Sequence, residues 1–358
     1  MSTEVERRLW EQLKEERAAS RRLLSELKPY RKAADAAERF ARAVNTAKPP
    51  PWLLKPGKAA AHGPGVPLLH LSDLHMNEYV HARDVAGRNR FSPSIALTRL
   101  ERTFQTAIDL ALNHMVTPSG WTYPGFVVVL NGDLLDNLLG NYHRSERHSD
   151  PIADAVASTT NALAVGIARL ADIFGDVLVI CVPGNHGRTT EKMPSEYPAG
   201  SNLDTIVYNN LKVHRLLAGK RVTVLVAPGT ELRFKVYGTS FVATHGYQWR
   251  GGDGEIGSLG PVTRGVKRLR AAYSQLNLDV DVVLVGHFHQ YFPGVDFRMN
   301  GSLKGYDAMA MKNKYPYQPP IQDFFFVHPE WGITAQWPIY VDGRKPHPDK
   351  RWALVEAA

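Results

Sequence analysis

Five short apolar segments end abruptly in Asp, Asn or His, and this recurrence constrains the fold more than any other feature of the chain. The segments are LLHLSDLH (68–75), FVVVLNGDLLD (126–136), VLVICVPGNHG (177–187), FVATHG (241–246) and VVLVGHFH (282–289). Helix-like stretches, 94–114 and 153–174, separate the first three. Strands that alternate with helices predict an α/β core, in which functional groups gather where the strands end.

The polar residues at these five ends are of the types that bind metal ions. Those predicted to be ligands are Asp73, His75, Asp133, Asn185, His245, His287 and His289. One HxH pair arises by accident, but five such ends in one chain do not. Carboxylate and imidazole without thiolate suit Mn, Fe or Zn rather than a structural cysteine-bound zinc. Seven ligands are too many for one ion and predict two ions, about 3.5–4 Å apart, that hold a hydroxide and clamp a phosphate.

Taken in order, the motifs resemble those of the calcineurin-like metallophosphoesterase superfamily: DxH, GDxxD, GNH followed by an acidic residue, a lone His, and GHxH. Here they are DLH (73–75), GDLLD (132–136), GNH (184–186), His245 and GHFH (286–289). The resemblance covers roughly residues 67–340. The motif sequences are similar to those of phage-encoded, nuclease-like members. It implies a four-layer αββα sandwich of two mixed sheets flanked by helices, with the active site at the C-terminal edges of the sheets.

The resemblance also implies a role for each motif residue. The first ion would be held by Asp73, His75 and His289. The second ion would be held by Asn185, His245 and His287. Asp133 would bridge the two ions. His186 would be the general acid that protonates the leaving oxygen, or would stabilise charge there, and Asp136 would orient His186.

The chain departs from the pattern in two places. Gly187 and Arg188 follow GNH where an acidic residue is usual. That residue is not a ligand in the pattern, so metal binding should survive, and Arg188 is either a phosphate contact or a solvated loop charge. GDLLD is followed by Asn-Leu rather than the Arg-Gly of Ser/Thr phosphoprotein phosphatases, which argues against that branch. Further candidates for phosphate binding, against the alternative of plain polar loops, are Arg144, Arg147 and Lys304.

Composition limits the class of protein. The chain has 358 residues, 44% of them hydrophobic, which fits one large globular domain or two ordinary ones. No apolar run approaches the roughly 20 residues of a membrane span, and the N-terminal stretch has no apolar signal core. The single cysteine, Cys181, excludes an intramolecular disulfide and lies in an apolar segment. We therefore expect a buried thiol in a cytoplasmic protein.

Charge and Pro/Gly content divide the chain. Residues 1–58 hold 14 Lys and Arg against 8 Asp and Glu, so most of the formal net charge of +8 lies near the N-terminus. We expect a charged helical arm at 1–47, a linker at 48–66, the phosphoesterase domain at 67–345 and a tail at 346–358. The arm is a candidate for homo-oligomerisation or partner docking. The excess of basic residues fits a nucleic-acid partner, or it simply gives the protein a basic surface.

Together these features predict a dinuclear hydrolase that cleaves phosphodiester bonds by metal-bridging hydroxide, with Mn²⁺ favoured over Fe or Zn. The expected substrate is DNA or RNA, which would make the chain a nuclease. A phosphomonoesterase or a small-nucleotide phosphodiesterase is the alternative enzyme. A non-catalytic nucleic-acid-binding or scaffolding protein is the alternative of a different class.

Overall fold

The computed structural model of the protein describes residues 65–114, 123–137, 151–191, 198–249 and 257–343, with a few helical positions between Glu4 and Arg21. The chain divides into two units, Met1–Lys48 and Pro49–Ala358. Most of the expected arm and linker, the whole tail, and Arg144 and Arg147 lie outside the described residues, so the domain boundaries stay predictions. Among the helices described, none has the length and apolar character to cross a membrane.

The first of two sheets has six strands in the order β11-β10-β1-β2-β3-β4. They are β1 (Val66–Leu71), β2 (Phe126–Asn131), β3 (Val177–Val182), β4 (Val222–Val226), β10 (Ile321–His328) and β11 (Gly332–Tyr340). Strands β1 to β4 are parallel, whereas β10 and β11 pair antiparallel. Every residue of β1, β2 and β3 is buried, as expected of continuous apolar runs covered on both faces.

The second sheet has five strands in the order β5-β6-β7-β9-β8. They are β5 (Glu231–Val236), β6 (Thr239–Thr244), β7 (Val282–Val285), β8 (Phe292–Pro293) and β9 (Phe297–Met299). The three central strands are parallel, and β5 and β8 pair antiparallel at the edges. Both sheets are therefore mixed, as expected.

The two sheets pack face to face through the alternation of side chains along each strand. In β2, Val127 and Val129 point into the core between the sheets, whereas Phe126 points to the opposite face. Across that core the ring of Phe241 in β6 stacks on Phe325 in β10, with centroids 6.2 Å apart. The alternation thus gives each buried strand one face toward the other sheet and one toward helices.

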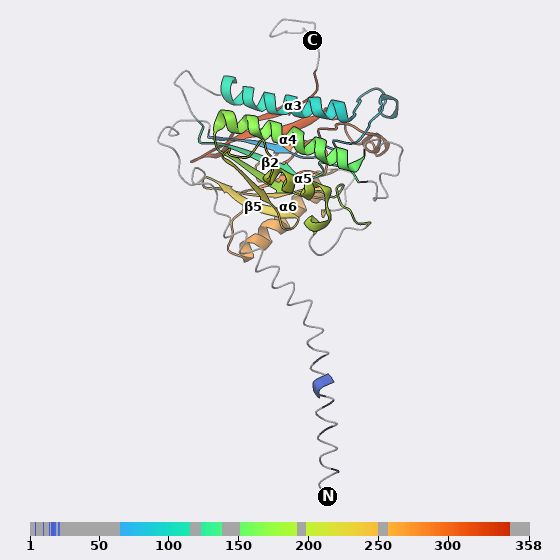
Figure 1. The fold of residues 1–358 in the computed structure, drawn as a ribbon, viewed down its shortest axis with the longest axis vertical. Helices are drawn as coiled ribbons and strands as arrows, with labels where there is room; N and C mark the ends of the chain where they lie inside the picture. The colour runs from blue at the N-terminus through green and yellow to red at the C-terminus, as the bar shows by residue number, and fades with distance from the viewer. Residues whose placement is uncertain are drawn as a thin grey trace, which may run out of the picture. The chain divides into compact units, whose positions relative to one another are not determined.

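Helices cover the outer faces of both sheets. On the six-stranded sheet these are α3 (Pro93–Asp109), which continues as a π-helical turn over Leu110–His114, α4 (Ile152–Phe174) and α5 (Leu203–Lys212). Figure 1 shows α3 and α4 side by side along one face, with α6 (Leu259–Gln275) on the other side of the paired sheets. The shorter helices are η2 (Ala82–Val85), η4 (Pro198–Ser201) and α7 (Ala308–Lys312). This arrangement confirms the expected four-layer αββα sandwich.

Cys181 lies in the middle of β3 and is completely buried. Burial raises the pKa of its thiol well above the usual range. The side chain therefore behaves as a small apolar group of the core.

Gly166 lets α4 approach α3, because a Cβ at this position would lie 2.5 Å from Cδ2 of the buried Phe104 ring. Alanine gains about 1 kcal/mol over glycine in a helix, but overpacking costs about 1–3 kcal/mol. We expect Gly166→Ala to lower the free energy of unfolding by about 1 kcal/mol in urea denaturation. Val165→Ala, at the exposed neighbouring position, is the control and should change it by less than about 0.5 kcal/mol. A more stable Gly166→Ala protein would contradict this packing.

Candidate metal centre

The turns that follow β2 and β3 touch one another through two glycines. Gly132 has φ of +83°, and a Cβ there would lie 2.6 Å from Cα of Gly184. The turn after β1 joins them, because the Asp73 amide donates to the Gly132 carbonyl at 3.0 Å. Glycine at 132 and 184 is thus a condition for bringing the three motif turns of this sheet together.

Asn131, the last residue of β2, connects this edge to the second sheet. Its side-chain Nδ2 donates to the carbonyls of Thr244 in β6 and Leu284 in β7, at 3.0 and 3.1 Å. Its own carbonyl accepts from Nδ1 of His245 at 2.7 Å. The C-terminal ends of parallel strands from both sheets therefore meet at one place.

Two groups of ligand atoms result. In the first, the His289 Nε2 lies 3.2 Å from both the Asp73 Oδ1 and the His75 Nε2. In the second, the His245 Nε2 lies 2.9 Å from the Asp133 Oδ2, and His287 completes the group. Within each group the ligand atoms lie within 4.8 Å of one another, which is the spacing of donors around a shared cation.

The Asn185 Oδ1, beside the second group, is buried without a hydrogen-bond partner among the described residues. The buried Asp133 Oδ2 and His245 Nε2 form an ion pair with each other, 2.9 Å apart, but not a hydrogen bond of good geometry. An unsatisfied buried donor or acceptor costs about 1–3 kcal/mol, so such atoms call for an explanation. A divalent cation would satisfy all three, and the donor set of carboxylate, amide oxygen and imidazole fits one.

Hydrogen bonds on the far side of two rings fix which nitrogen is free to bind a cation. The His245 Nδ1 is taken by the Asn131 carbonyl, and the His75 Nδ1 by the Asp136 Oδ2 at 2.7 Å. Both rings are held in the tautomer that presents Nε2 to the centre. A carbonyl or carboxylate behind a ligating histidine has this effect in metal proteins.

Asp136 orients two histidines. Its second oxygen, Oδ1, lies 2.6 Å from the His186 Nδ1. Asn77 fixes Asp136 in turn, because its side chain accepts from the Asp136 amide and donates to its carbonyl, both at 2.9 Å. Asp136, His75 and His186 would also satisfy the distances of a metal site, but the Asp136 oxygens are used by the two Nδ1 atoms.

Burial and neighbouring charges shift the pKa of the acidic residues. Burial alone would raise the pKa of Asp73, Asp133 and Asp136, each of which is fully enclosed. The facing imidazoles outweigh this effect and hold the pKa of all three carboxyls below the usual range. The centre therefore keeps three carboxylates at neutral pH.

Burial and neighbouring charges shift the pKa of the histidines in opposite directions. Burial lowers the pKa of His186 and His245. Asp133, together with Asp136 at His186 and with Asp73 at His245, outweighs burial and raises the pKa of each to about 9. Burial, together with the positive charge of His245, lowers the pKa of His287 to about 3. Without bound ions, His186 and His245 are therefore cations at neutral pH.

The backbone is strained at the ligands. Five of the nine non-glycine residues with positive φ in the described part of the chain are expected ligands: Asp73 (54°), His75 (47°), Asp133 (53°), His287 (68°) and His289 (54°). Such left-handed conformations cost of order 1 kcal/mol each, and they persist only where the surroundings enforce them.

Lys304, a candidate phosphate contact, is 2% exposed. Its Nζ lies 2.8 Å from both the Glu78 Oε2 and the Asp307 Oδ2. Burial lowers the pKa of Lys304, but these two carboxylates outweigh it and raise the pKa above its usual value. Glu78 also lies 3.6 Å from the His75 Nδ1, so the structure places Lys304 behind the metal ligands.

Arg188 is half-buried, and its guanidinium donates to the Asn185 carbonyl at 2.7 Å. It therefore braces the turn that carries Asn185. Arg144 and Arg147 lie outside the described residues. Four other residues contact the centre but lie outside the sequence motifs, so the motifs could not predict their roles. They are Asn77, Glu78, Asp204 and Asp307.

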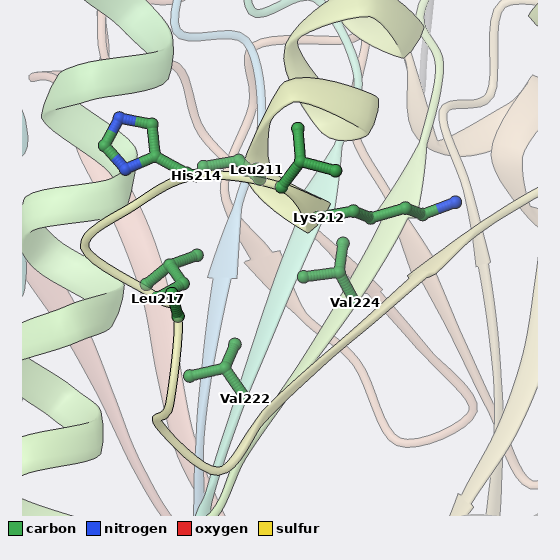
Figure 2. A pocket seen from close by; sticks show the side chains of 8 residues that line it. Leu211, Lys212, His214, Leu217, Val222 and Val224 are labelled. Carbon is green, nitrogen blue, oxygen red and sulfur yellow. The ribbon is translucent and has the colours of Figure 1, made fainter.

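A pocket of about 170 Å³ lies elsewhere, between the end of α5 and β4 (Figure 2). Leu211, Leu217, Val222 and Val224 supply much of its wall, and His214 stands at its border. Its lining includes none of the ligand residues. This pocket is therefore separate from the candidate metal centre.

A family model agrees with this geometry. The family model for calcineurin-like phosphoesterases matches residues 66–291. Similar solved structures include a predicted phosphoesterase from Streptococcus pneumoniae, with 10% identity, a TM-score of 0.29, and coverage of 76% of this chain and 98% of that one. Vacuolar protein sorting 29 from Cryptosporidium parvum has 13% identity, a TM-score of 0.33, and coverage of 77% and 98%. No curated protein matches the sequence. The family match spans well over half of the chain, and the chain belongs to the calcineurin-like phosphoesterase family.

Proposed function

We propose that the chain hydrolyses phosphodiester bonds with two divalent cations, and that its substrate is nucleic acid. The observation that carries this proposal is the pair of adjoining ligand groups around Asp73 and Asp133. They adjoin because the His245 Nε2 lies 2.9 Å from the Asp133 Oδ2 and 3.9 Å from the Asp73 Oδ1. Two neighbouring ions, when bound, polarise the phosphoryl oxygens and lower the pKa of a water. The absence of sulfur from both groups supports Mn²⁺, with Fe or Zn as alternatives.

His186 is the proposed general acid. Its Nδ1 is held by Asp136, and its Nε2 lies 3.8 Å from the Asp133 Oδ2. The side chain is 19% exposed, so Nε2 can reach a bound ester from the solvent side. Without bound ions its pKa is raised to about 9, so the ring carries a proton at neutral pH, which suits a group that gives a proton to the leaving oxygen.

A basic and aromatic surface beside the centre supports a nucleic-acid substrate. We call it the rim, and its exposed members are Arg83, Arg88, Arg90, Lys312, Lys314, Tyr315 and Tyr317. The acidic residues of the same segments offset it little, because Glu78 and Asp307 are buried and Asp84 is half-buried. An exposed surface of one sign with aromatic rings suits a chain of phosphates and bases.

A hydrogen bond joins the chain segment that carries the rim tyrosines to the segment that carries the ligand His289. The amide of Tyr291, two residues after His289, donates to the side-chain Oε1 of Gln318, one residue after Tyr317, at 2.7 Å. The Arg88 guanidinium lies 5.8 Å from the centroids of both Tyr306 and Tyr317. The rim is therefore continuous with the segment that carries His289, and it presents both positive charge and a π face.

Two other functions remain as alternatives. A phosphomonoesterase or small-nucleotide phosphodiesterase would use the same ligands without needing the rim. A non-catalytic binding protein would need the rim without needing the ligands. Activity and binding measured separately distinguish all three.

Removal of the proposed acid tests the catalytic role. We expect His186→Ala to lower kcat on bis-p-nitrophenyl phosphate, with Mn²⁺ supplied, by about 10²–10⁴-fold, the usual contribution of a general acid. His214→Ala is the matched control, because His214 is a half-buried histidine that contacts Asn161 away from the ligands, and it should keep full activity. Hydrolysis of p-nitrophenyl phosphate alone would favour the monoesterase. No turnover of either ester by the Mn²⁺-loaded protein would favour the binding function.

Ion binding should release protons. His245 carries a proton at pH 7 in the ion-free protein, because its pKa is raised to about 9, and a ligand nitrogen must lose that proton. Apparent affinity for Mn²⁺ should therefore rise with pH up to about 9 and level off above it. Titration calorimetry at pH 7 in buffers of different ionisation enthalpy measures the released protons. A heat that is the same in every buffer would contradict this expectation.

Substitution in the rim tests the substrate. Stacking contributes about 1–3 kcal/mol per base, so Tyr317→Ala should weaken binding of a fluorescent single-stranded oligonucleotide by about tenfold in anisotropy titrations. The matched control is Trp331→Ala, because Trp331 is 75% exposed but lies in the turn between β10 and β11. That turn is beside the start of β1, at the opposite end from the ligands. Equal affinity for both variants would remove the rim from the proposal.

A further inference from the structure

Helix α5 crosses the ends of β2 and β3 and bonds to both turns that follow them. The Oδ2 of Asp204, in its first turn, accepts from the backbone amides of Asp133 and Gly184, both at 2.9 Å. The Oδ1 accepts from the amide of Leu134 at 3.1 Å. One turn later the hydroxyl of Tyr208 donates to the carbonyl of Val182 at 2.9 Å. Asp204 is completely buried, so these amides take the place of its water shell.

The amides that Asp204 holds belong to the residues that define the centre. Asp133 is the expected bridging ligand and has φ of +53°, a conformation that its surroundings must enforce. Gly184 precedes the ligand Asn185. The two turns are also joined directly, because the His186 amide donates to the Asp133 Oδ1 at 2.8 Å. A shift of Asp204 would therefore move ligands of both turns.

The side chains of Asp204 and Asn202 fill the space beside Gly187. A Cβ built on Gly187 would lie 2.5 Å from the Asn202 Oδ1 and 3.1 Å from the Asp204 Oδ1. Gly187 does not have the positive φ that would itself exclude a side chain. A carboxylate on residue 187 would therefore point to the place that the Asp204 carboxylate occupies. Position 187 is also where the resembling pattern has its acidic residue.

We propose that Asp204 is a positioning residue of the metal centre, and that it supplies from α5 the carboxylate that this chain lacks after GNH. It acts by holding the amides of Asp133, Leu134 and Gly184, which keeps the ligands of two turns in register. Its effect on ion binding rests on the function proposed above, whereas its effect on the turns does not.

The first test removes one acceptor oxygen without changing the shape of the side chain. We expect Asp204→Asn to weaken binding of Mn²⁺ by about 10–100-fold in calorimetric titration of the full chain, as for other residues that orient metal ligands. The matched control is Asp281→Asn, because the Asp281 Oδ2 accepts from the amide and hydroxyl of Ser240 at the start of β6, away from the ligands. Binding of Mn²⁺ by Asp204→Asn within about threefold of the unaltered protein would overturn the proposal.

The second test returns the carboxylate from the neighbouring turn. The starting variant combines Asn202→Ser with Asp204→Ala; serine keeps a capping oxygen for α5 and removes the amide group that stands 2.5 Å from the new Cβ. Adding Gly187→Asp should then recover roughly tenfold or more of the lost Mn²⁺ affinity. A purely structural defect in α5 would not be repaired by a substitution in another segment. If the Mn²⁺ affinity did not recover, the proposal that a carboxylate at position 187 can replace that of Asp204 would be contradicted.

Hydrogen exchange in the ion-free protein separates this proposal from the proposed function. We expect amides in 131–137 and 184–187 to exchange roughly tenfold faster in Asp204→Asn than in the unaltered chain, with no such change in Asp281→Asn. If the unaltered chain binds no Mn²⁺, the proposed function fails while this measurement still decides the role of Asp204. Unchanged exchange in both segments would overturn that role.

Discussion

The contact between the ends of the two sheets is the constraint on which the centre depends. Ligands come from three strands of one sheet and two of the other, so an error in the placement of either sheet would separate them. Asn131 fixes that placement, because its side chain and its carbonyl together reach β6, β7 and the ring of His245. It is completely buried, so each of these bonds forms in a dry environment where an unpaired partner is costly.

Buried charge gives the centre its chemical character. Three carboxylates without nearby cations would not stay ionised in such surroundings, and the imidazoles supply the compensating charge when no ion is bound. The same imidazoles are ligands, so a proton and a metal ion compete for them. The left-handed backbone conformations of five ligand residues add a further cost in free energy. In the proposed enzyme, ions would replace protons without a large movement of the side chains.

Much of the fold and the gathering of the motif residues could be predicted from the sequence, because both follow from local patterns. The stretch 153–174 differs by one residue from α4 (Ile152–Phe174), and 94–114 corresponds to α3 with its π-helical turn. The surroundings of Lys304 were beyond prediction, because Glu78 lies 226 positions away along the chain. Asp204 was missed for the same reason: its contacts arise only when α5 packs across two strand ends, and NLD carries no recognisable motif.

The single thiol of Cys181 can report directly on unfolding of the protein. It is the one cysteine of the chain and is completely buried in β3. An alkylating reagent therefore reaches it only when the sheet unfolds. Labelling kinetics would then follow global unfolding directly, with no background from other thiols. A cysteine introduced at any exposed position could likewise be modified selectively in the folded state, which makes the chain suited to site-directed fluorescence and spin labelling.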